Sequence, residues 1–190
     1  MNNKKSVIGL VGLAGSGKSE LAKFLVNSFK LSCVDLDKIG HKLLEKPVVI
    51  DKLRWMFGDQ IIKEQSIDRN ALGRIVFNNR ADLKKLNNYI HPKLIEVAKK
   101  EIMLSTKSTL IVGSLLIDFK LNYCCDYVVG IKSTHQDTSY FISSKQWLIR
   151  SSQDHLHKQL DKLEYCLVND FNPLCFFEKA HTYFSSLLRN

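Results

Sequence analysis

Eight consecutive residues, 12–19, have the types and the spacing needed to bind phosphate groups. They read Gly-Leu-Ala-Gly-Ser-Gly-Lys-Ser and match the pattern GxxxxGK[ST] at every fixed position. Glycine lets the backbone turn tightly, so successive N–H groups point into one concavity. In such a loop Lys18 reaches the β- and γ-phosphates of a nucleotide and the Ser19 hydroxyl ligates Mg²⁺. We therefore expect ATP and Mg²⁺ to be held by Gly12, Ala14, Gly15, Ser16, Gly17, Lys18 and Ser19.

The flanking sequence predicts the elements that such a loop requires. Residues 6–12 form a continuous apolar run that glycine ends, which is typical of a buried parallel strand. Residues 18–29 place apolar side chains at helical spacing, and a helix there adds the positive end of its dipole to the phosphate site. The alternative is a glycine turn of another α/β protein, and the strand and helix on either side argue against it.

The rest of the chain alternates between apolar strands and helices. This alternation predicts an α/β fold of the P-loop nucleoside-triphosphate-binding class, a parallel sheet flanked by helices. Asp68 is expected to cap a helix, and proline after His91 is expected to break or kink another. We interpret residues 1–190 as one kinase domain. Further strands are expected at 31–35, 109–113, 127–131 and 165–168, and a closing helix at 173–188. Within the domain we expect a helical acceptor-binding insertion at about 38–105 and a short lid at about 133–163.

Composition limits the classes of partner. The 190 residues are 45% hydrophobic and 25% charged, and no apolar run approaches the ~20 residues of a membrane span. Lys and Arg outnumber Asp and Glu by 28 to 19, and the net charge of +9 favours anionic ligands. The cations form no continuous basic run and no nucleic-acid-binding motif, which argues against DNA or RNA as a partner.

Five cysteines without CxxC spacing favour a reduced compartment. Most of them are expected to be small apolar groups in the core. The first residues lack the cleavage site of a signal peptide, so the sequence predicts a cytoplasmic protein. We expect it to be a monomer.

Two carboxylates, Asp35 and Asp37, follow the second predicted strand. Ligands of open α/β sheets bind at the carboxyl ends of the strands. A carboxylate there can take a proton from an attacking hydroxyl group or help hold Mg²⁺. Either residue can equally cap the helix that follows. Position alone leaves the two roles open, and only one of the two side chains needs to face the cleft.

With these features the chain resembles the dephospho-CoA kinase family. The family phosphorylates the ribose 3′-hydroxyl of dephospho-CoA with ATP and Mg²⁺. The match in the helical insertion is the most specific, because the glycine loop alone occurs in many kinases. The matching blocks are IGLVGLAGSGKS at 8–19, VDLDKIGHKLL at 34–44, FGD at 57–59, IDRNALGRIVFNNRADLKKLNNYIHP at 67–92, LIVGSLLID at 110–118 and CDYVV at 125–129.

The resemblance assigns roles that spacing alone does not. It implies that Asp37 is the catalytic carboxylate toward the 3′-hydroxyl, with Lys18 on the phosphates. It implies that dephospho-CoA is the acceptor, bound by Asp37, His41, Arg69, His91 and Asp118. Without the resemblance, we would interpret His91, which precedes proline, as a structural residue and Arg69 as a solvent-exposed charge.

The chain departs from the family pattern in two places. Ser114 and Asp118 stand where the family has proline and glutamate, so the carboxylate is one methylene shorter. The family lid has the pattern QLxRxxxR. Gln136 matches its glutamine, but Ser139 and Ser143 stand at the two arginine positions, and the nearest cations are Lys145 and Arg150. Because such arginines stabilise charge on the transferring phosphoryl group, two alternatives stay open. One is another small-molecule or nucleotide kinase, and the other is a nucleotide-binding pseudo-kinase.

Overall fold

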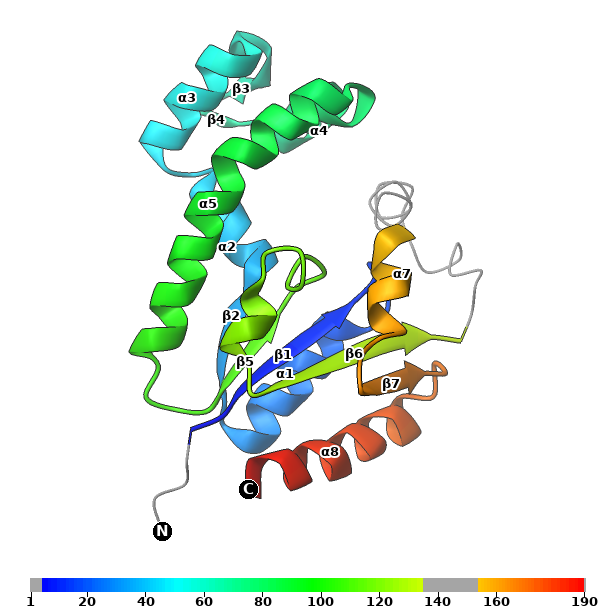
Figure 1. Cartoon of the computed structure of the whole chain (residues 1–190). Helices are drawn as coiled ribbons and strands as arrows, with labels where there is room; N and C mark the ends of the chain where they lie inside the picture. The colour runs from blue at the N-terminus through cyan, green and yellow to red at the C-terminus, as the bar shows by residue number, and fades with distance from the viewer. Residues whose placement is uncertain (1–4, 135–153, 190) are drawn as a thin grey trace. The chain divides into compact units, whose positions relative to one another are not determined.

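The computed structural model describes residues 5–134 and 154–189. Strands and helices follow one another along the chain, with a mainly helical stretch between β2 and β5 (Figure 1). The strands are β1 (Val7–Gly12), β2 (Ser32–Asp35), β3 (Ile62–Lys63), β4 (Ser66–Ile67), β5 (Thr109–Val112), β6 (Tyr127–Ser133) and β7 (Tyr165–Asn169). The helices are α1 (Lys18–Phe29), α2 (Leu36–Leu43), α3 (Pro47–Phe57), α4 (Arg69–Asn78), α5 (Arg80–Leu104), α7 (Asp154–Leu160) and α8 (Pro173–Arg189), with 3-10 turns η1 (Asp59–Ile61) and η2 (Leu121–Cys124).

The main sheet has five parallel strands in the order β2-β5-β1-β6-β7. The strand that precedes the glycine loop, β1, is central and pairs with β5 on one side and β6 on the other. Parallel strands covered on both faces read as continuous apolar runs, which is why the strand prediction holds here. The predicted α/β fold with a parallel sheet is confirmed.

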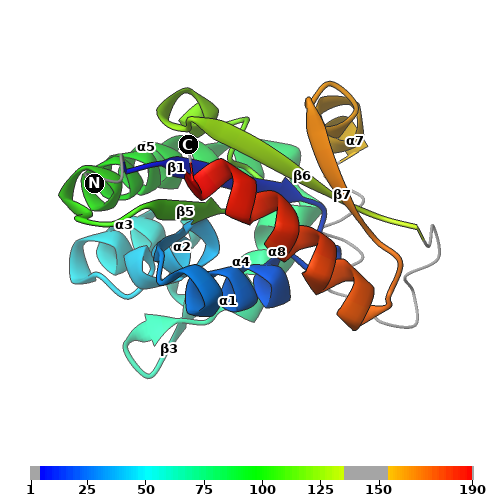
Figure 2. The same cartoon turned by 90° about the horizontal axis from the view of Figure 1, so that it is seen from below.

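Helices cover both faces of this sheet (Figure 2). Ile8 and Leu10 of β1 join a buried cluster with Leu21 and Leu25 of α1 and with α8. On the opposite face, a Cβ atom added at Gly9 would lie 3.0–3.1 Å from side-chain atoms of Leu116 and Cys125. The segment after β5 therefore packs closely against this face of the sheet. Helix α7 covers that second face too, near β1 and β6. The glycine loop therefore projects from a sheet that is buried on both sides.

The chain forms two compact units. The first contains the five-stranded sheet and comprises residues 1–36 and 101–190, and the second comprises residues 37–100. The second unit is mainly helical, as expected. Its helix α4 begins at Asp68, whose carboxylate accepts hydrogen bonds from the backbone N–H groups of Asn70 (2.8 Å) and Ala71 (3.1 Å). These bonds lower the pKa of Asp68, because they favour the charged carboxylate. The predicted cap is confirmed.

The second unit also contains a two-stranded antiparallel hairpin, β3–β4, which the sequence did not indicate. Its turn residues, Glu64 and Gln65, both have positive φ, 48° and 63°. Tight hairpins favour glycine or asparagine at such positions, and neither is present. Each strand is only two residues long, so no alternating pattern is available to predict it.

A break or a kink was predicted at His91-Pro92. Helix α5 runs without a break through Pro92, so the predicted break is wrong. Proline removes one backbone hydrogen bond from a helix interior. Here Ile90, Leu94 and Ala98 are buried at four-residue intervals on both sides of it. This apolar packing keeps the helix continuous where local propensity disfavours it.

The cysteine prediction is also corrected. None of the five cysteines forms a disulfide, and none belongs to the buried core: Cys33 on edge strand β2 is exposed, and the other four are partly buried. Burial raises the pKa of the Cys125 thiol to about 12, because the charged thiolate is poorly solvated there. None of the described helices combines the length and apolar character needed to cross a bilayer.

Candidate functional site

Backbone conformation and close packing require glycine at three positions of the loop. Gly15 and Gly17 have φ of 76° and 91°, a region that disfavours residues with a side chain. A Cβ atom at Gly12 would lie 2.7 Å from the backbone oxygen of Ile131 on β6. Helix α1 begins with Gly17 as its N-cap and has no side-chain cap. Its first N–H groups therefore face the loop without a side-chain acceptor, an arrangement that suits an anion.

Lys18 lies in the first turn of α1 and is 8% exposed. Its ammonium group donates a 2.6 Å hydrogen bond to the backbone oxygen of Leu13, five residues earlier. The side chain therefore turns back over its own loop. A phosphate group in the loop would offer this buried cation a charged acceptor, and such hydrogen bonds are about twice as strong as neutral ones.

Asn169, at the carboxyl end of β7, supports the loop from outside. Its amide nitrogen donates to the backbone oxygen of Ser16 at 3.1 Å, and its amide oxygen accepts from the N–H of Phe171 at 3.0 Å. A Cβ atom at Gly17 would lie 2.5 Å from the Asn169 nitrogen. Sequence reasoning missed this residue. A polar side chain at the carboxyl end of a parallel strand was the available signal, the same signal that identified Asp35.

Replacing Asn169 with alanine is expected to weaken MgATP binding by up to about tenfold, because the Ser16 carbonyl then loses its partner and the loop its support. Isothermal titration with MgATP measures the change. Asn27→Ala is the matched control, since Asn27 is an exposed amide residue on α1. Unchanged affinity in Asn169→Ala would mean that the loop keeps its shape without this contact.

A pocket of about 430 Å³ lies between the loop and the start of α8. One side is polar and comes from the loop and α1, and the other is aromatic. The lining residues are Gly15, Gly17, Lys18, Ser19, Glu20, Asn169, Phe171, Pro173, Phe176 and Phe177. Beside it, the Ser16 hydroxyl is buried and makes no hydrogen bond within the described residues. Backbone donors, a cation and an apolar wall in one pocket suit a nucleotide.

The residues present also fit Mg²⁺ delivered with a nucleotide. Ser19 is exposed in the pocket and supplies one hydroxyl oxygen. Over residues 5–134 and 154–189, no group of three or more His, Cys, Asp or Glu side chains forms a metal cage. Mg²⁺ usually keeps several waters and takes its other ligands from substrate phosphates and one or two protein oxygens, so a single hydroxyl is an appropriate donor set.

Asp118 follows β5 and contacts α7. Its two carboxylate oxygens bind His155 Nε2 at 2.8 Å and Gln159 Nε2 at 2.9 Å. The Asp118 side chain is 29% exposed and that of His155 51%. Neither partner was predicted. From the family pattern, Asp118 was expected to bind substrate. In the structure its carboxylate connects the segment after β5 to α7.

Replacing Asp118 with alanine is expected to lower the free energy of unfolding by about 1 kcal/mol, since two partly exposed hydrogen bonds are lost. Urea denaturation followed by circular dichroism measures this. Glu164→Ala removes an exposed carboxylate near the end of α7 and serves as the control. Equal stability of the two variants would contradict a structural role for the Asp118 contacts.

The remaining predicted acceptor residues belong to the second unit. Asp37 lies in the first turn of α2 and not on β2, so the strand alternation assumed for Asp35 and Asp37 does not apply. His41 follows one turn later, on the same face of the helix. Arg69 is the exposed first residue of α4, and His91 is half-buried in the middle of α5. The lid positions Gln136, Ser139, Ser143, Lys145 and Arg150 lie outside the described residues.

Comparison with known proteins gives one consistent family. The family model for dephospho-CoA kinase matches residues 6–171. A dephospho-CoA kinase of Fusobacterium nucleatum is 30% identical over 187 residues, which cover 93% of this chain and 96% of that protein. The one from Borreliella burgdorferi is 34% identical over 137 residues, covering 70% of this chain and 65% of that protein. The match thus spans less than two thirds of the latter's length.

Among solved structures, a dephospho-CoA kinase from Campylobacter jejuni superposes with a TM-score of 0.68 at 21% identity, covering 98% of this chain and 99% of that one. At this identity the likeness shows the fold alone.

Proposed function

Because this chain belongs to the dephospho-CoA kinase family, we propose that it transfers the γ-phosphoryl group of ATP to the 3′-hydroxyl of dephospho-CoA, giving CoA and ADP. This reaction is the last step of coenzyme A biosynthesis. The observation that carries the proposal is the glycine loop with buried Lys18, placed at the end of the central strand and opening on a pocket with an aromatic wall.

The donor half of the reaction uses the first unit. Backbone N–H groups of the loop and the start of α1 bind the phosphates, and Lys18 offsets charge on the β- and γ-phosphates as the phosphoryl group moves. Asn169 keeps the loop in shape through Ser16. The adenine ring packs against the aromatic side of the pocket, where Phe171 and Phe177 lie. The Ser19 hydroxyl would hold Mg²⁺, which would add neutralisation of charge on the phosphates.

The acceptor half uses residues of the second unit. Asp37 orients the 3′-hydroxyl and accepts its proton, since a carboxylate at this position is the general base that the reaction needs. His41, Arg69 and His91 bind the acceptor, and the fully charged guanidinium of Arg69 suits its diphosphate. Catalysis then rests on positioning and electrostatic stabilisation rather than on a covalent intermediate.

The same proposal extends to the organisation of the chain. Residues of about 38–105 form an acceptor-binding insertion in a single kinase domain, and residues of about 133–163 form a lid over ATP. Lys145 and Arg150, which lie outside the described residues, are the two candidates to replace the family arginines. The protein works as a monomer in the cytoplasm, where ATP is available and where cysteines such as its own five, which form no disulfide, stay reduced.

The decisive experiment measures ADP release from the purified protein with MgATP, with and without dephospho-CoA, and detects CoA by mass spectrometry. We expect ADP only in the presence of dephospho-CoA, with CoA formed in equal amount. MgATP binding without CoA formation would contradict the proposed activity. It would favour a nucleotide-binding protein without transfer, or a kinase for another small acceptor that a panel of nucleosides and nucleotides would identify.

A further inference from the structure

A second cavity, of about 630 Å³, lies at the opposite ends of α1 and α8 from the glycine loop. The first turn of α1 carries Lys18, whereas its last residue, Phe29, lines the second cavity. Helix α8 lines the nucleotide pocket with Phe176 and Phe177 near its start and the second cavity with His181 and residues after it. Twelve residues of α helix span about 18 Å, so the two cavities are separate sites.

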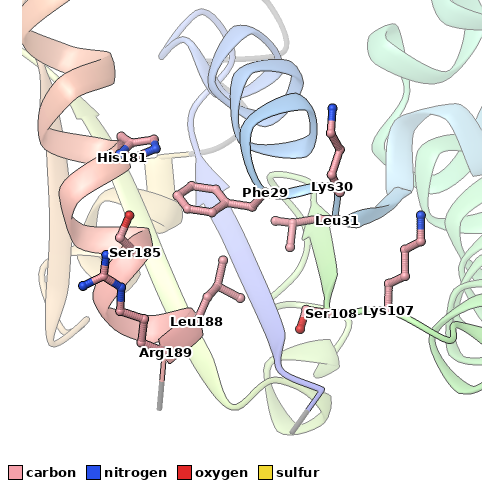
Figure 3. A pocket seen from close by; sticks show the side chains of 9 residues that line it. All are labelled: Phe29, Lys30, Leu31, Lys107, Ser108, His181, Ser185, Leu188 and Arg189. Atoms are coloured by element: carbon pink, nitrogen blue, oxygen red, sulfur yellow. The ribbon is translucent and has the colours of Figure 1, made fainter. Parts of the chain in front are cut away.

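Three cations line the second cavity, each from a different segment. Lys30 follows α1, Lys107 precedes β5, and Arg189 ends α8. Figure 3 shows the two lysines on one side and Arg189 on the other, with apolar side chains between them. The lining contains no aspartate or glutamate. Cations from three separated segments that line one cavity, without a carboxylate among them, favour an anionic ligand.

The three charges are not used elsewhere in the described part of the chain. Within residues 5–134 and 154–189, the side-chain nitrogens of Lys30, Lys107 and Arg189 form no ion pair or hydrogen bond, and the bonds at Lys107 come from its backbone N–H and carbonyl oxygen. All three residues are exposed, so they remain solvated without a ligand. Ser108 and Ser185, which also line the cavity, add hydroxyl groups that can donate to an anion.

Between the cations lies an apolar surface. The rings of Phe29 and His181 are stacked, with centroids 4.9 Å apart and planes at 24°. Leu31 and Leu188 continue this surface toward the N-terminal ends of the strands (Figure 3). A planar ring packs well on such a surface, and the volume falls within the 300–1,000 Å³ that is typical of small-molecule sites.

We propose that this cavity is a second ligand site, which binds a phosphorylated small molecule carrying a planar ring, such as a nucleotide. The phosphate groups lie at Lys30 and Lys107, and the ring lies beside Phe29 and His181, between these lysines and Arg189. The site shares no residue with the nucleotide pocket at the loop, and the inference does not depend on the reaction proposed above.

The test uses the full chain with Lys18→Ala, which weakens phosphate binding at the glycine loop. ADP is titrated by calorimetry, and the His181 ring signals are followed by NMR. We expect one ADP to bind and these signals to shift. Adding Lys30→Glu and Lys107→Glu is expected to weaken ADP binding by about tenfold or more, since hydrogen bonds to charged groups are lost and repulsion is added. The matched control is Lys158→Glu with Lys162→Glu, which makes the same charge change at exposed positions in and just after α7.

A second variant tests the ring. Phe29→Leu keeps an apolar side chain, so it is expected to weaken ADP binding several-fold while leaving tripolyphosphate binding unchanged. Three results would overturn the proposal. The first is that ADP leaves the His181 signals unmoved. The second is that both charge-reversal pairs weaken ADP binding equally, because ADP binding would then depend only on the net charge of the protein. The third is that ADP and tripolyphosphate respond alike to Phe29→Leu, which indicates an anion site without ring recognition.

Discussion

Lys18→Ala is expected to lower the rate of CoA formation by about a thousandfold or more, the largest effect among the substitutions considered. Loss of a single preorganised donor to the charge that develops in a transition state already lowers turnover by about a hundredfold to a thousandfold. Lys18 is a full positive charge, and its burial limits screening by water. The rate is measured as CoA formed from dephospho-CoA and MgATP, with mass detection.

Lys18→Ala also removes the hydrogen bond to Leu13, so loss of rate alone does not separate charge from loop structure. Lys18→Met keeps the length of the stem without the ammonium group and should be almost as slow. Lys23→Ala, an exposed lysine on the same helix, should retain normal activity. If Lys18→Met were active, the loop and α1 dipole alone would suffice for the reaction.

Asp37→Asn is expected to lower kcat by about a hundredfold or more while leaving the Kd for MgATP nearly unchanged. The amide has the same shape as the carboxylate but cannot accept the proton of the 3′-hydroxyl. Turnover is measured as CoA formation, and MgATP binding by calorimetry. Asp37 also lies in the first turn of α2, where a negative charge stabilises the helix by roughly 0.3–1 kcal/mol, so thermal unfolding of the variant should be recorded as well.

Asp35→Asn is the control for the Asp37 assignment. Asp35 ends β2 and is partly buried, whereas Asp37 is exposed. We expect Asp35→Asn to retain much more activity than Asp37→Asn. The reverse order would move the role of general base to Asp35, the alternative that the sequence left open.

The features that sequence reasoning predicted well are local or strongly patterned. The glycine loop depends on residues next to one another in the chain, and the buried parallel strands are continuous apolar runs. Asp68 caps α4 through residues two and three positions later. In each case the signal that predicts the structure lies within one short window of sequence, even where the strands themselves pair with distant segments.

The features that were missed depend on distant partners. Asn169 contacts Ser16 across 153 positions, and Asp118 contacts His155 across 37. No local pattern carries these contacts, although the place of Asn169 at a strand end marked it as a candidate. The helix through Pro92 was mispredicted for a related reason: buried neighbours outweigh an unfavourable residue, and burial is a property of the folded chain.

The insertion of residues 37–100 between β2 and β5 determines the order in which the chain can fold. The second unit is one contiguous stretch, so its contacts close over short sequence separations. The sheet requires Val7 to meet Thr109 and Cys33 to meet Leu110, pairings that wait until the whole insertion has been synthesised. Such high contact order slows folding. During translation the insertion is therefore complete first, and the phosphate loop, which Asn169 supports, is among the last parts to reach its final form.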